Sequence, residues 1–149
     1  MTKKEAIAAE PCPVARSVDL IGDRWALLIV RDAFDGVRRF SEFQRNLGVA
    51  RNILADRLRR LVEAGILAIQ PNAKGGAYQE YVLTERGQRL FAVVVALRQW
   101  GERELFAPGE AHSDLVEMKT GKPLRRMAPL ADDGSLLAPD DTEVRKLPQ

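Results

Sequence analysis

Apolar residues recur at helical spacing through the first part of the chain, and the breaks fall at proline, glycine and capping residues. The first such run predicts a helix over residues 13–21, because proline at position 13 is well tolerated at the start of a helix. Gly22 ends this helix, and Asp23 can cap a second one that continues through RWALLIVRDAF. The second helix has no single apolar stripe, which predicts burial on most of its sides.

A short helix, a turn and a longer helix are predicted between residues 40 and 65. Ser41 and Gln44 have the spacing of a capping box, which predicts that the short helix opens at Ser41 and stops near Gly48. The next helix is predicted over residues 51–64 and ends before a glycine. Its apolar positions follow the three-and-four spacing of a buried stripe: Leu54, Leu58, Leu61 and Val62.

The hydrophobic period changes from helical to alternating after Gly65. Residues 66–70 and 78–83 read as two strands, and the glycine-containing loop 71–77 joins them into a hairpin. Residues 37–39, which follow an Asp-Gly turn signal, read as a further short strand. The expected fold class is therefore mainly α with a small β-hairpin, an α+β arrangement.

One long helix and a polar extension complete the chain. Thr84 can cap a helix over residues 85–105, and this helix is apolar on more than one side, which indicates a dimer element. We therefore expect a flexible N-terminal segment (1–11), a folded and dimerising domain (12–107) and a C-terminal extension (108–149). In the extension, residues 115–118 and 124–128 can pair as a β-hairpin, followed by an extended tail.

Charge is concentrated where the helix pair lies. The chain of 149 residues has a net charge of only +2, but seven arginines face two acidic residues between positions 36 and 60. Residues 108–149 instead carry six basic and eight acidic side chains. A basic patch on a nearly neutral protein is the electrostatic footprint of a nucleic-acid contact.

The cysteine and histidine content excludes several other classes of protein. A single cysteine, Cys12, and a single histidine, His112, allow no intrachain disulfide and no structural zinc site of the usual kind. We expect no metal and no cofactor, and without a nucleophile–base pair or a phosphate loop we expect no enzyme. No apolar run approaches the length of a membrane span, and no secretory signal is recognisable, so a cytoplasmic protein without membrane contact is expected.

The order of the predicted elements is that of a winged helix-turn-helix domain. The chain has Cys-Pro before the first helix, Asp-Arg-Trp opening the second, then Arg-Phe-Ser-Glu-Phe and a Leu-x-x-x-Leu-x-x-Leu-x-x-x-Gly run. In these motifs residues 12–106 resemble the HxlR-type transcriptional regulators, relatives of the MarR group. The resemblance implies homodimers that bind double-stranded operator DNA, with helix 51–64 in the major groove and the hairpin, or wing, near the minor groove or the backbone.

The face of helix 51–64 opposite its leucine stripe supplies the candidate DNA contacts. It presents Arg51, Asn52, Ala55, Asp56 and Arg59. The first two lie at the N-terminal end, where a recognition helix meets base edges, and Arg with guanine or Asn with adenine gives roughly 1–3 kcal/mol of discrimination each. Phosphate contacts are expected from Arg38, Arg39, Ser41, Gln44, Arg57 and Arg59, and Lys74 on the wing is a candidate for a phosphate or a minor-groove contact. Ala50, just before this helix, cannot cap it, and Arg60 is open to an ion pair with Glu63 or Glu42 instead.

Cys12 has two interpretations. It can be a small half-buried residue before a helix, or a redox sensor, because a helix N-terminus stabilises a thiolate. The resemblance supports a sensor, since some HxlR members sense electrophiles or oxidants with a cysteine at this place. With no second cysteine, oxidation would give a Cys12–Cys12 link across a dimer, a mixed disulfide or an adduct.

The expected function is that of a homodimeric repressor of a pseudo-palindromic operator, with a small molecule or an oxidant as its effector. The alternative is a winged helix that serves only as a protein-interaction module, without specific DNA binding. Salt dependence of DNA affinity separates the two, because phosphate contacts weaken steeply with salt. The extension can pack against the domain, extend the dimer or shape a ligand cavity.

Overall fold

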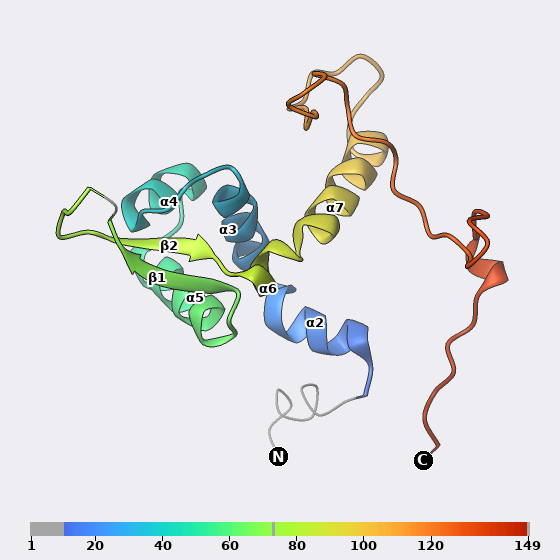
Figure 1. Ribbon diagram of the computed structural model, residues 1–149, viewed down its shortest axis with the longest axis horizontal. Helices are drawn as coiled ribbons and strands as arrows, with labels where there is room; N and C mark the ends of the chain where they lie inside the picture. Colours follow the sequence, from blue (N-terminus) through green and yellow to red (C-terminus); the bar gives the residue numbers. More distant parts are fainter. Residues whose placement is uncertain (1–10, 73, 149) are drawn as a thin grey trace. The chain divides into compact units, whose positions relative to one another are not determined.

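A computed structural model describes residues 11–72 and 74–148, so the predicted flexible segment 1–11 lies, except for its last residue, outside the described residues. The chain forms two compact units, which divide between Val94 and Val95. The first unit contains five helices and a β-hairpin, and the second consists of most of one helix and the C-terminal extension (Figure 1).

The two N-terminal helices have the bounds that the sequence predicts. Helix α2 spans Pro13–Ile21, and α3 spans Arg24–Phe34. Asp23 is the N-cap of α3, where its Oδ2 accepts a hydrogen bond from the backbone N–H of Trp25 at 3.2 Å. This bond satisfies one of the N–H groups that a helix start leaves unpaired. Helix α3 is central, as expected from its lack of a single stripe, and its buried residues are Ala26, Ile29, Val30 and Asp32.

The helix-turn-helix pair consists of α4 (Phe40–Leu47) and α5 (Arg51–Glu63). The predicted capping box at Ser41 is wrong, because Arg39 is the N-cap of α4 and makes no side-chain capping bond. The N-cap therefore lies two residues earlier than predicted, which places Ser41 in the first turn of α4. Gly48 ends α4 with a φ of 63°, in the left-handed region that glycine adopts without steric cost.

Strands β1 (Leu67–Pro71) and β2 (Gln79–Leu83) form an antiparallel hairpin in which Leu67 pairs with Leu83. This is the wing predicted from the alternating pattern. The strand predicted at residues 37–39 is wrong: that segment makes one backbone hydrogen bond to the sheet, from the N–H of Tyr81 to the carbonyl of Arg38 at 2.7 Å. A single bond joins this segment to the wing but does not build a ladder.

The helix predicted over residues 85–105 is divided into α6 (Glu85–Gln88) and α7 (Phe91–Glu104). Thr84 caps α6, as predicted, and its Oγ1 accepts a hydrogen bond from the N–H of Gly87 at 3.0 Å. The helix is interrupted between α6 and α7, where the N–H of Leu90 donates to the carbonyl of Gly87. This bond spans three residues, whereas the bonds of an α-helix span four.

The first unit has one hydrophobic core between its helices and the wing. Helix α3 contacts α4, α5 and β2, while α5 also contacts β1 (Figure 1). The largest fully buried side chains are Phe43, Ile29, Leu54, Leu58, Leu61, Leu67 and Val30. Burial of each such side chain stabilises the fold by roughly 1.5–3 kcal/mol. Three of the seven belong to α5, so the core fixes which face of that helix remains exposed.

In the second unit, the extension is fixed to α7 by two polar side chains. Arg98 donates from Nη1 to the carbonyl of Ser113 at 2.9 Å. Gln99 donates from Nε2 to the carbonyl of Arg125 at 3.1 Å, and its Oε1 accepts from the N–H of Met127 at 2.7 Å. The amide of Gln99 thus replaces a neighbouring strand for residues 125–127.

The hairpin predicted in the extension is reduced to one isolated bridge between Val116 and Pro123. A second bridge, which the sequence did not predict, joins Leu130 and Leu136. A short 3₁₀ helix, η1, follows at Pro139–Asp141. None of the helices among the described residues has the length and the apolar character needed to cross a membrane.

Gly87 provides a test of how α6 packs against the hairpin. A Cβ atom at this position would collide with the backbone carbonyl oxygen of Ile66, which cannot rotate away. We expect Gly87→Ala to lower the free energy of unfolding by roughly 1–3 kcal/mol in urea denaturation.

The matched control is Gly101→Ala in α7, where an added Cβ would meet only Leu105 Cδ1, at 3.9 Å. That change should leave stability unchanged or raise it by up to about 1 kcal/mol, because alanine favours the helix. Equal stability of the two variants would contradict the close approach of α6 to the hairpin.

Candidate nucleic-acid interface

Helix α5 presents its predicted polar face away from the core. Leu54, Leu58 and Leu61 are buried, while Arg51 and Asn52 in the first turn are exposed. Farther along this face lie the exposed Ala55 and Arg59 and the half-buried Asp56. As expected, Ala50 is the N-cap of α5 and makes no side-chain capping bond.

Arg51 is positioned by an aromatic ring. Its guanidinium carbon lies 5.1 Å from the ring centroid of Phe40, a cation–π distance. Because Phe40 is the first residue of α4, this contact joins the N-terminal ends of the two helices of the pair. The side chain of Arg51 is therefore held at the end of α5 that can approach base edges.

Asp56 is the shared acceptor of three arginines on α5. It accepts hydrogen bonds from Arg57 Nη1 at 2.6 Å and from Arg59 Nη2 at 2.7 Å, and it forms an ion pair with Arg60 Nε at 3.1 Å. The hydrogen bond from Arg59 is the main cause that lowers the pKa of the Asp56 carboxyl. In return, hydrogen bonds to Asp56 and then to Glu63 raise the pKa of Arg59. Arg60 thus pairs with Asp56 rather than with Glu63 or Glu42.

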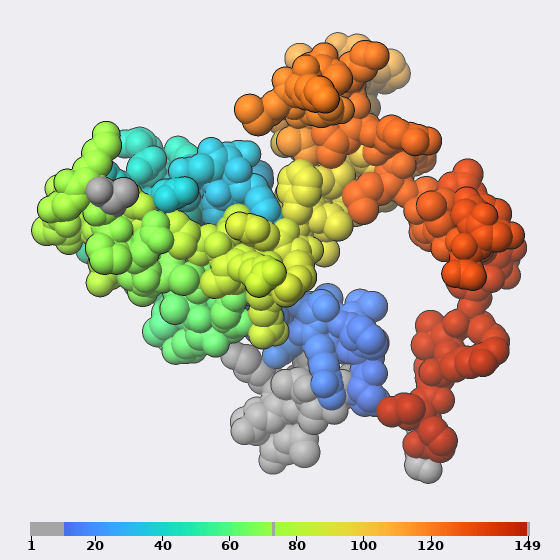
Figure 2. All heavy atoms as spheres, viewed as in Figure 1, coloured from blue at the N-terminus to red at the C-terminus, as the bar shows by residue number. Residues whose placement is uncertain are grey.

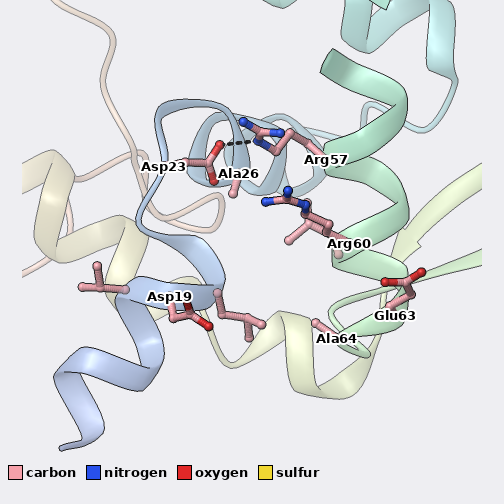
Figure 3. Close-up of a pocket in the computed structure, with 10 residues that line it drawn as sticks. Asp19, Asp23, Ala26, Arg57, Arg60, Glu63 and Ala64 are labelled. Atoms are coloured by element: carbon pink, nitrogen blue, oxygen red, sulfur yellow. Dashed lines mark hydrogen bonds and ion pairs between the residues drawn. The ribbon is translucent and has the colours of Figure 1, made fainter. Parts of the chain in front are cut away.

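Arg57 links the recognition helix to the start of α3. It donates from Nε to Asp23 Oδ2 at 2.7 Å, and this hydrogen bond is the main cause that raises the pKa of the Arg57 guanidinium (Figure 3). Its side chain is 25% exposed, compared with 57% for Arg59. A phosphate contact by Arg57, as predicted from the sequence, would therefore require this ion pair to open.

A hollow of about 500 Å³ lies beside this ion pair, between α2, α3 and the C-terminal half of α5 (Figure 3). Arg57 and Arg60 are among its lining residues, together with Asp19 and the apolar side chains of Val18 and Leu61. The hollow thus borders two of the three arginines that bond to Asp56.

The remaining candidates lie at the start of α4 and on the wing. Arg38 forms an ion pair with the buried Glu80 of β2 at 3.5 Å. The guanidinium of Arg39 lies 5.2 Å from the ring centroid of Tyr78, in the wing loop just before β2. Ser41 and Lys74 are exposed, and Gln44 is half-buried.

Sequence reasoning missed Tyr78 and Glu80 as partners of these arginines. Tyr78 lies just before β2 and Glu80 is its second residue, so alternation along the predicted strand 78–83 would have placed both on one face. That alternation does not predict that Tyr78 contacts Arg39 or that Glu80 pairs with Arg38. Together the contacts join the wing to the N-terminal end of α4.

Cys12 lies at the helix start that the sequence predicted. It is the N-cap of α2, is half-buried, and its Sγ accepts a hydrogen bond from the N–H of Ala15 at 3.4 Å. Within residues 11–72 and 74–148, no group of three or more His, Cys, Asp or Glu side chains is arranged to hold a metal ion.

These features define a winged helix-turn-helix protein: a recognition helix over a leucine core, a preceding short helix and a two-stranded wing. Residues 20–107 match the model of the HxlR-like helix-turn-helix family, and the chain belongs to this family. Curated relatives of the chain are named HTH-type transcriptional regulators, so residues 20–107 form a helix-turn-helix domain of the kind that such regulators carry.

Three similar proteins illustrate the relationship. The HTH-type transcriptional regulator Mb3122 of Mycobacterium bovis is 50% identical over 95 residues, which cover 64% of this chain and 60% of the relative. PA1607, a candidate transcription factor with a known crystal structure, is 52% identical with a TM-score of 0.90. The match covers 95% of this chain and 99% of the PA1607 chain. The redox regulator HypR in its oxidized form is 32% identical with a TM-score of 0.58. The match covers 64% of this chain and 100% of the HypR chain. The chain thus spans less than two thirds of the length of Mb3122.

Asp56 provides a test of how charge is balanced on the recognition helix. We expect Asp56→Asn to raise affinity for random-sequence DNA, because it leaves three arginines with one negative charge fewer. The slope of log affinity against log salt should steepen by about 1, as for one further phosphate contact. Fluorescence anisotropy at several salt concentrations measures both quantities.

Glu85→Gln is the matched control, because Glu85 makes a similar surface ion pair with Arg89, at 3.5 Å, on α6. It removes the same charge away from α5 and should change affinity little. If both variants bind DNA equally, only total charge matters and Asp56 has no special role.

Proposed function

We propose that the protein is a homodimeric repressor that binds a pseudo-palindromic operator through two copies of α5. The observation that carries this proposal is the exposed pair Arg51 and Asn52 in the first turn of α5, above a fully buried leucine stripe. A helix held in this way can enter the major groove with its N-terminal residues at the base edges.

The contacts divide into two kinds under this proposal. Arg51 and Asn52 read bases, because their side chains match the donors and acceptors of guanine and adenine. Phosphates are bound by the surrounding group, namely Arg38, Arg39, Ser41, Gln44, Arg57, Arg59 and Lys74. Phosphate contacts position the protein on the duplex without reading its sequence.

The dimer is supported by apolar side chains that are exposed on two helices. Val14 and Val18 are exposed on α2, and Leu97 and Trp100 on α7. Exposed apolar side chains of this kind are typical of association sites. A two-fold dimer would place its two recognition helices in successive major grooves, roughly 34–36 Å apart.

The test of this proposal uses a binding site selected from random DNA. We expect Arg51→Ala to weaken binding to the selected site by roughly 1–3 kcal/mol and to relax the preference at one base position, with little change on random DNA. Lys74→Ala should weaken binding to all DNA alike and reduce the salt slope by about 1. Anisotropy titrations on both DNAs measure these changes.

Arg89→Ala, on α6, is the control for loss of an exposed arginine and should leave the selected preference unchanged. An unchanged preference in Arg51→Ala would remove Arg51 from base recognition. Binding without salt dependence would favour the other proposal, a winged helix that acts only as a protein-interaction module.

An effector would act by one of two routes. A thiol-reactive compound would modify Cys12, which caps α2 and has a hydrogen-bonded sulfur. The similarity to the redox regulator HypR supports this route. A small molecule would instead occupy the hollow beside Arg57 and Arg60, where it would compete with Asp56 for their N–H groups.

The thiol route is tested with Cys12→Ser. Serine retains an N-cap acceptor, so DNA binding by the reduced protein should be unchanged. An oxidant such as diamide should release wild-type protein from DNA but leave Cys12→Ser bound, as seen in mobility-shift assays. If the variant responds to diamide like wild type, the thiol route is discarded and the hollow becomes the candidate effector site.

A further inference from the structure

The last part of the extension, residues 128–147, forms a segment that we call the C-terminal arm. It begins directly after Met127, the last residue that Gln99 of α7 holds. The hydrogen bonds that organise the arm are local. The N–H of Ala131 bonds to the carbonyl of Ser135 at 2.8 Å, and the N–H of Leu137 bonds to the carbonyl of Pro129 at 3.1 Å.

The arm exposes most of its large apolar side chains. Leu130 and Leu136 face each other across the isolated bridge. The exposed fractions of the apolar side chains are 59% for Leu130, 72% for Leu136, 85% for Val144 and 69% for Leu147. In Figure 2 the arm, coloured red, is drawn out as a narrow run of atoms. A two-stranded hairpin with exposed leucines is at best marginally stable in water, so a covering surface is needed to hold it.

We propose that the C-terminal arm packs against a second copy of this chain, so that each protomer of the dimer grips the other. The inference rests on the homodimer proposed above and adds the segment that makes the contact. In a two-fold dimer the contact occurs twice, because each copy supplies both an arm and a receiving surface.

Charge complementarity favours a second copy as the occupant. The arm carries five acidic and two basic side chains, a net charge of −3. Residues 11–94 carry thirteen basic and nine acidic side chains, a net charge of +4. The arm is therefore complementary in net charge to the winged helix unit of a second copy, and such complementarity favours their association.

The similarity to PA1607 supports a defined path of the backbone in the C-terminal arm. That similarity extends over 95% of this chain, so it includes most of the arm and not only the winged helix unit. A segment whose described backbone hydrogen bonds are all local, and which exposes four large apolar side chains, does not fix its own path. Contacts with another protomer would define it.

The first experiment uses the full chain with Leu130→Asp and Leu136→Asp together, and sedimentation equilibrium as the readout. We expect the dimer dissociation constant to rise on the order of tenfold or more, because buried apolar anchors dominate interfaces. The control is Met118→Asp, which adds charge to a fully exposed side chain in the same extension and should change nothing.

The outcomes separate this inference from the homodimer proposal. A wild-type monomer at all concentrations would overturn the homodimer and the arm contact together. A wild-type dimer that the double variant leaves unchanged would overturn only the arm contact. Circular dichroism should show the same helix content for all variants, since the arm contains only one short 3₁₀ helix.

The second experiment asks directly what the arm touches. A photo-crosslinking amino acid at position 136 is placed in one of two differently tagged copies, which are mixed and allowed to exchange subunits. Crosslinked products that carry both tags are expected. Products confined to one chain would show that the arm covers its own protomer and would overturn the proposal.

Discussion

The burial of one stripe of leucines determines what the rest of this protein can do. Leu54, Leu58 and Leu61 of α5 are fully buried against a core centred on α3. Rotating α5 by one residue would expose these leucines and bring arginines toward the core, at a cost of several kcal/mol for the apolar surface alone. The orientation of α5 is therefore set by packing, and the exposed position of Arg51 and Asn52 is a consequence of that packing.

Once this face is fixed, the four arginines of α5 do not act as equal charges. Asp56 and Asp23 hold Arg57, and Asp56 also holds Arg59 and Arg60. The negative charges are therefore placed where they lower the attraction of the middle of α5 for any phosphate. A recognition helix with uncompensated charge would bind all DNA well, since the phosphate term carries no sequence information.

The sequence predicts those parts of the structure that depend on local signals. The helices α2, α3 and α5, and the caps Asp23 and Thr84, follow from spacing and from residues next to one another. The start of α4 does not, because there tertiary packing overrides a local capping pattern. The break between α6 and α7 and the ion pair from Arg57 to Asp23 depend on residues brought together by the fold, and no periodicity reports such partners.

The way each arginine is held decides which of them is suited to read a base. Carboxylates hold Arg57, Arg59 and Arg60 through their N–H groups, so a new partner for those donors must displace an ion pair. Phe40 instead restrains Arg51 through its aromatic ring, which offers no carboxylate oxygen to the N–H groups of the guanidinium. A side chain that is restrained and still has its fork of N–H groups loses less conformational entropy on binding guanine. For this reason Arg51, rather than the arginines that follow it along α5, has the properties that base recognition requires.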